Sequence, residues 1–94
     1  MWDIYEHRKV QKQLTKCPLD VQKRYEKWKD IVQFSGPRGL LLIRGFRDES
    51  LRGNLKGFRS SRLNKQYRII YKVIEDQFVV TVVEVNHHDY RSKA

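Results

Sequence analysis

The chain has 94 residues, which is enough for one domain with a single small core and too few for two. Its 20 lysine and arginine residues exceed the 11 aspartate and glutamate residues, so the formal net charge is +9. That excess predicts a polyanionic partner, and net charge alone leaves nucleic acid, an anionic membrane and an acidic protein open. Cys17 is the single cysteine, which excludes an internal disulfide and predicts a reducing compartment, the cytoplasm.

Neither a secretion signal nor a membrane segment is expected from the pattern of apolar residues. The N-terminus lacks a basic stretch followed by an apolar run. The longest apolar run, residues 40–43, is far too short to cross a bilayer. We therefore expect no membrane partner.

The first third of the chain predicts one strand and two helices. Residues 2–5 alternate apolar and polar side chains, as a short strand does. The residues that follow place Val10 and Leu14 four apart among polar side chains, which indicates a short amphipathic helix. A second helix should begin at a proline and end near Gly36, a glycine followed by another proline. Its apolar positions are Val21, Tyr25, Trp28 and Val32.

The remainder of the chain predicts a loop and then strands. Residues 38–54 are rich in glycine, and we expect mostly loop, although the apolar run inside them fits a buried strand or a short helix. Residues 58–63 predict a short strand. Residues 66–74 and 78–85 are rich in isoleucine, valine and tyrosine and predict a hairpin.

This order of elements predicts a single α+β domain over residues 1–94. Two helices should cover one face of a small antiparallel sheet of about four strands. Side chains alternate along a strand, so residues 66–74 should present one set to the helices and the other to the uncovered face. The helix-facing set is Tyr67, Ile69, Tyr71 and Val73, and the outward set is Arg68, Ile70 and Lys72.

The positive charge gathers in residues 44–72, which hold nine basic and two acidic residues and so carry +7 of the net +9. Three histidines and one cysteine form no zinc pattern, and no phosphate-binding loop or nucleophile elbow is present. We therefore expect no metal and no cofactor. The uncovered face of the sheet, rich in arginine, is the predicted binding surface for a nucleic acid.

Metal-free RNA cleavage requires a base for the 2′-hydroxyl, cations for the phosphoryl oxygens and an acid for the leaving oxygen. Arginine can supply the cation. Histidine and tyrosine can supply the acid and the base, and residues 86–91 contain both residue types. An arginine on a strand is more often a solvated surface residue, and two histidines near a terminus are more often surface groups. The residues alone therefore predict nucleic-acid binding and leave catalysis open.

A motif within residues 49–73 narrows the choice. It combines a turn of the form Leu-x-Gly-aromatic, a basic strand and the run Tyr-Arg-Ile-Ile-Tyr. This motif resembles the RelE/ParE toxin superfamily, and most closely the RelE, YoeB and HigB messenger-RNA interferases. The resemblance implies a RelE-like fold and a toxin of a type II toxin–antitoxin system. Such an endoribonuclease cleaves mRNA, usually on the translating ribosome, and so inhibits translation.

The same resemblance implies roles for individual residues. The implied catalytic set is Glu49, Arg68, His87, His88 and Tyr90. The implied RNA-binding set is Arg52, Lys56, Arg59, Arg62 and Lys65. Arg62 and Arg68 resemble the strand arginines that bind the scissile phosphate. Glu49 or one of the two histidines would act as base, and Tyr90 or a histidine as acid.

Two other functions stay open at this point. A ParE-like toxin shares the fold, inhibits DNA gyrase and has no nuclease activity. A simple RNA-binding module would bind phosphates and cleave nothing. For either toxin, the resemblance and the positive charge together imply a cognate antitoxin protein with an acidic or partly disordered segment that covers the cationic face.

Overall fold

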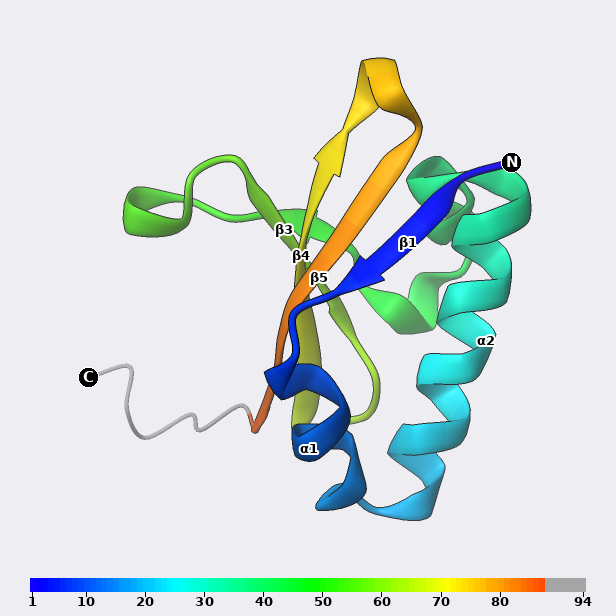
Figure 1. Ribbon diagram of the computed structural model, residues 1–94. Helices are drawn as coiled ribbons and strands as arrows, with labels where there is room; N and C mark the ends of the chain where they lie inside the picture. The colour runs from blue at the N-terminus through cyan, green and yellow to red at the C-terminus, as the bar shows by residue number, and fades with distance from the viewer. Residues whose placement is uncertain (88–94) are drawn as a thin grey trace.

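The computed structural model of the chain describes residues 1–87, which form a sheet covered on one face by two helices (Figure 1). The helices are α1 (Lys9–Thr15) and α2 (Leu19–Ser35). The strands are β1 (Asp3–Glu6), β2 (Glu49–Ser50), β3 (Phe58–Arg62), β4 (Tyr67–Ile74) and β5 (Val79–His87). In the sheet they follow the order β1-β5-β4-β3-β2. The predicted α+β class is confirmed.

The sheet differs from the prediction in two respects. It has five strands in place of about four, because Glu49 and Ser50 form a short strand in the segment predicted to be mostly loop. It is also mixed, because β1 runs parallel to β5 while the other strand pairs are antiparallel. Alternation within a strand does not encode the direction of its neighbour, which depends on how the two helices return the chain to the sheet.

The segment between α2 and β3 is irregular, as predicted, and is built from tight turns. Its 3₁₀ turns span Pro37–Leu42, Arg44–Phe46 and Gly53–Leu55. Leu40 and Phe46 are fully buried and fix the first two turns against the core. The apolar run that fitted either a strand or a short helix is therefore largely a 3₁₀ helix.

The helices begin and end close to their predicted positions. α1 begins at Lys9, later than expected, because β1 continues to Glu6. α2 ends at Ser35, and Gly36 follows with a φ of 75°, which favours glycine. A Cβ on Gly36 would lie 2.5 Å from the indole nitrogen of Trp2, so space also requires glycine there. No helix within residues 1–87 is long and apolar enough to cross a membrane.

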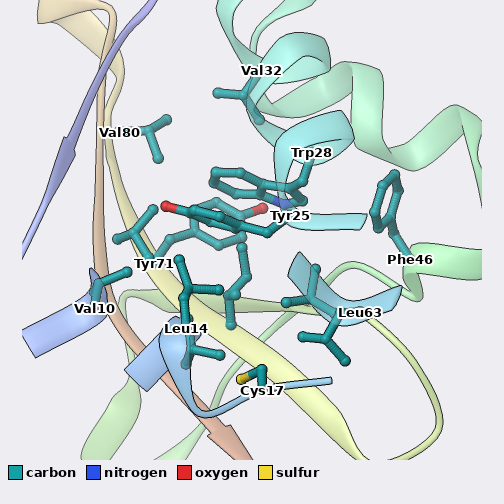
Figure 2. Close-up of a cluster of buried hydrophobic side chains, with 14 of the residues drawn as sticks. Val10, Leu14, Cys17, Tyr25, Trp28, Val32, Phe46, Leu63, Tyr71 and Val80 are labelled. Atoms are coloured by element: carbon teal, nitrogen blue, oxygen red, sulfur yellow. The ribbon is translucent and has the colours of Figure 1, made fainter. Parts of the chain in front are cut away.

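The core lies between the helices and one face of the sheet (Figure 2). Its centre is aromatic. Trp28 stacks on Tyr25 with ring centroids 5.9 Å apart, and it forms a T-shaped pair with Tyr71 with ring centroids 5.2 Å apart. The predicted helix-facing set of β4 is confirmed, since Ile69 and Tyr71 are fully buried and Tyr67 and Val73 pack against the core cluster. This packing fixes which side chains of each strand point away from the helices.

A bulge between β4 and β5 changes the outward pattern of β5. Ile70 pairs with Glu84 and Tyr71 pairs with Val82, so Val83 has no direct partner on β4. Val82 and Val85 both belong to the core cluster, although simple alternation from Val82 would place Glu84 there instead. The bulge therefore turns the Glu84 carboxylate to the face of the sheet that α1 and α2 leave uncovered.

Candidate functional site

The face of the sheet opposite α1 and α2, called the open face below, carries its side chains in three neighbouring rows. Residues that pair across strands lie on the same face, so the registers define these rows. The middle row is Glu49, Ser60, Ile70 and Glu84. The row on one side is Arg62, Arg68 and Asn86, and the row on the other side begins with Phe58 and Lys72. The predicted outward set of β4 therefore lies on the open face.

The centre of the arginine row is a pair of like charges. Arg62 on β3 lies directly opposite Arg68 on β4. Two cations in this position repel each other and destabilise the strand pair. Within residues 1–87, the Nε of Arg68 is buried and has no hydrogen-bond partner. A buried donor without a partner is costly, so this pair is suited to an anion that accepts hydrogen bonds from both guanidinium groups.

Glu84 and Asn86 lie on the other side of Arg68. Asn86 is the cross-strand partner of Arg68, and its side-chain amide donates a hydrogen bond to the Glu84 carboxylate. Lys9 Nζ donates to the same carboxylate at 3.3 Å. The hydrogen bond from Asn86, followed by the contributions of Lys9 and Arg68, lowers the pKa of Glu84. Glu84 therefore stays ionised, and its negative charge offsets part of the positive charge near Arg68.

One residue of the implied RNA-binding set, Arg59, lies on the covered face of the same strands instead of the open face. Arg59 on β3 donates to the Asp48 carboxylate through Nε at 3.0 Å and through Nη2 at 2.7 Å. The Asp48 side chain is only 1% exposed and also accepts hydrogen bonds from Ser61 and Tyr71. Burial, followed by the hydrogen bond to this carboxylate, raises the pKa of Tyr71 well above its ordinary value. Ser61 in turn accepts a 2.9 Å hydrogen bond from the indole of Trp28.

This buried network fixes the start of β2. Asp48 is held by three side chains, and the next residue, Glu49, pairs with Ser60 and is exposed on the open face. Glu49 lies one row from the arginine pair, about 7 Å along the strand direction. Within residues 1–87, no three histidine, cysteine, aspartate or glutamate side chains gather as a metal site would require.

The other residues implied by the resemblance lie around the open face. Arg52 and Lys56 are exposed on the arm of residues 51–57 that joins β2 to β3, and Figure 1 shows this arm extending beyond the sheet. Lys65 is exposed in the turn between β3 and β4, at the end of the sheet where Arg62 and Arg68 lie.

Of the implied catalytic set, His87 lies off the open face, and two further residues lie outside the described residues. His87 is exposed at the end of β5, and its ring meets the edge of Tyr67 at 5.1 Å on the helix side of the sheet. His88 and Tyr90 lie outside the described residues. The sheet thus brings together Glu49 and Arg68 of the implied catalytic set with Arg62 of the implied RNA-binding set.

Asp48 and Glu84 were missed by sequence reasoning. An acidic residue in a basic segment was a signal for Asp48, because a carboxylate among arginines is a candidate ion-pair partner. For Glu84 there was no signal, because strict alternation assigns it to the core side and only the bulge reverses this. Asp48 holds Arg59 in place, and Glu84 offsets part of the charge of Arg68.

Several solved structures share the fold of this chain. No protein-family model and no curated protein matches the sequence. A chain of the archaeal RelE–RelB complex from Pyrococcus horikoshii is 25% identical, with 99% of this chain and 98% of that chain covered and a TM-score of 0.73.

Two further solved structures give the same result. The YoeB/ParE toxin from Agrobacterium tumefaciens is 12% identical over 93% of this chain and 99% of its own, with a TM-score of 0.72. A chain of the YoeB–YefM complex from Staphylococcus aureus is 17% identical over 95% of this chain and 99% of its own, with a TM-score of 0.69. The chain therefore has the fold of these RelE and YoeB toxin structures, which supports the resemblance to the RelE/ParE toxin superfamily.

Proposed function

We propose that this protein is the toxin of a type II toxin–antitoxin pair and that it cleaves messenger RNA, on the translating ribosome, without a metal ion. The observation that carries the proposal is the opposed pair Arg62 and Arg68 on the open face, with the buried Nε of Arg68 unpartnered within residues 1–87. A phosphate group is opposite in charge to this pair and accepts the hydrogen bonds that guanidinium groups donate. The fold shared with RelE and YoeB structures supports the assignment.

The proposed reaction uses the 2′-hydroxyl of the RNA as the nucleophile. Arg62 and Arg68 bind the scissile phosphate and stabilise the negative charge that grows on its oxygens. Glu49, one row away on the same face, takes the proton from the 2′-hydroxyl. His88 or Tyr90 then protonates the leaving 5′-oxygen. We leave His87 out of this set because its ring packs against Tyr67 on the opposite face.

The proposal includes an antitoxin as protein partner. Two of the similar solved structures are complexes with a second protein, RelE with RelB and YoeB with YefM. The net charge of +9 favours an acidic partner segment for this chain as well. The open face, where the arginine pair lies, is the surface that such a segment must cover in order to block RNA.

The test compares Arg68→Ala with Arg38→Ala, which removes the same charge from a side chain that is 89% exposed outside the site. Parent and variants are expressed in cells, 5′ ends of transcripts are mapped, and cleavage by purified protein is measured with and without ribosomes. We expect Arg68→Ala to abolish growth arrest and to slow cleavage about 100- to 1000-fold, as loss of a transition-state charge partner does. Arg38→Ala should behave like the parent.

Three outcomes contradict the proposal. Intact transcripts together with DNA damage would indicate a ParE-like inhibitor of DNA gyrase. RNA binding without turnover would indicate a simple binding module. Full cleavage by a folded Arg68→Ala protein would mean that the site is placed wrongly, and circular dichroism of the variant checks the fold.

A further inference from the structure

Phe58 is an aromatic side chain of the open face that takes no part in the core. Phe58, the first residue of β3, is partly exposed and is absent from the core cluster, whereas the rings of Tyr25, Trp28 and Tyr71 are fully buried within it. Its register position places it on the open face with Arg62 and Arg68. The fold therefore presents an apolar ring on the face that carries the arginine pair.

The position of Phe58 along β3 is fixed by the backbone. Gly57, with a φ of 95°, ends the arm, and Phe58 then pairs with Lys72 in the β3–β4 ladder. Phe58 and Arg62 are four residues apart on one face, which is about 14 Å along the strand. The middle row, with Glu49 at its end, lies halfway between the ring and the arginine pair.

A cation accompanies the ring. Lys72 is exposed, and its Nζ lies 5.7 Å from the centre of the Phe58 ring. Lys56 is exposed two residues before Phe58, on the arm. An aromatic ring for stacking, with cations beside it for the backbone, is the combination with which proteins bind single-stranded nucleic acid. In the middle row, Ser60 and Ile70 are 3% and 5% exposed, so these two side chains offer the RNA little surface of their own.

We propose that Phe58 is the stacking platform for one base of the bound RNA, with Lys72 and Lys56 holding the backbone beside that base. This inference rests on the proposed function, because it places the RNA across the open face from the arginine pair to the arm. Glu49 then faces the backbone between the stacked base and the phosphate held by Arg62 and Arg68. Stacking tolerates any base, so Phe58 contributes affinity and register and leaves base identity to other contacts.

The test is a double-mutant cycle that measures whether Phe58 and one base of the RNA depend on each other for binding. Single-stranded RNA with 2′-O-methyl groups, which block the nucleophile, is offered free and on ribosomes to the parent, Phe58→Leu and Phe58→Trp. An abasic nucleotide is moved through the RNA one position at a time. We expect one position where loss of the base weakens binding to the parent and to Phe58→Trp about tenfold and leaves Phe58→Leu nearly unaffected.

Phe34→Leu is the matched control, since Phe34 lies on α2 and is 74% exposed. It should bind every RNA as the parent does. A 2-aminopurine at the identified position should lose fluorescence on binding to the parent, which tests stacking without any variant. Absence of this quenching, or a Phe58→Leu protein that loses as much affinity as the parent when the base at that position is removed, overturns the inference and leaves the proposed function standing. A parent that binds RNA neither free nor on ribosomes overturns both.

Discussion

The two faces of the sheet treat their arginines in opposite ways. On the covered face, Arg59 donates two hydrogen bonds to Asp48, and Asp48 accepts further bonds from Ser61 and Tyr71. On the open face, three residues further along the same strand, Arg62 lies opposite another arginine. One face holds a charge pair whose carboxylate is buried and accepts several hydrogen bonds, and the other holds two like charges side by side.

This difference separates polar groups that hold the fold from polar groups that await a ligand. A buried carboxylate without its partners would cost several kcal/mol, so the Asp48 network can exist only as a complete set. The arginine pair has the reverse property, because removing either member relieves repulsion in the free protein. Stability measurements on single variants therefore distinguish the two classes.

The largest effect is expected at Asp48. Asp48→Asn removes the charge that faces Arg59 and cannot accept all of the hydrogen bonds that the carboxylate accepts now. We expect the free energy of unfolding to fall by about 3 kcal/mol, as it does when one partner of a buried ion pair is removed. Urea unfolding monitored by tryptophan fluorescence measures this change.

Glu49→Gln is the matched control for that variant. It makes the same chemical change at the next residue, which is exposed, so the free energy of unfolding should stay within about 0.5 kcal/mol of the parent. If Glu49 is the base, this variant loses cleavage while keeping its stability. Equal destabilisation by both substitutions would show that the buried network does not hold β2.

A smaller effect of opposite sign is expected at Arg62. Arg62→Gln removes one member of the opposed pair, and the free energy of unfolding should rise by up to about 1 kcal/mol. Inorganic phosphate should stabilise the parent more than the variant, because an anion that binds only the folded protein shifts unfolding by mass action. Arg59→Gln, the same change on the same strand, should lower stability instead. A destabilised Arg62→Gln protein would show that the pair is structural.

Much of the fold follows from local patterns, and the exceptions have specific causes. Steps of three and four placed Tyr25 and Trp28 in the core, and alternation placed Arg68 on the uncovered face, because both patterns depend only on the geometry of one element. The parallel pairing of β1 and the strand β2 depend on contacts distant in sequence. No local pattern carries that information.

The candidate site shows the same limit. Arg68 could be placed on the open face from alternation, but its direct pairing with Arg62 depends on the register that the turn between β3 and β4 imposes. Arg59 and Arg62 are both arginines in the same basic segment. They are three residues apart on β3, so their side chains point to opposite faces, and Arg59 points toward Asp48. The face of Glu84 depends on a bulge that leaves no mark in the residue types.

The smallest predicted effect is a fall in the free energy of unfolding at high pH. It comes from Tyr71, a member of the Asp48 network. Tyr71 has a raised pKa in the folded protein, so its contribution is intact below the ordinary tyrosine pKa of about 10 and declines above it, where only the unfolded chain ionises. Between pH 8 and pH 10.5 this one group should cost about 0.8 kcal/mol.

Tyr71→Phe tests this assignment because it removes the titrating group and keeps the ring. The variant should be less stable than the parent at pH 8, since the hydrogen bond to Asp48 is lost. Its stability should then fall less between the two pH values, by the amount that Tyr71 contributes. Tyr25, whose pKa is also raised by burial and by its bond to Glu6, stays in both proteins and cancels in the difference. Parallel pH profiles for parent and variant would mean that Tyr71 ionises as readily in the folded protein as in the unfolded chain, and that the Asp48 carboxylate does not hold its proton in place.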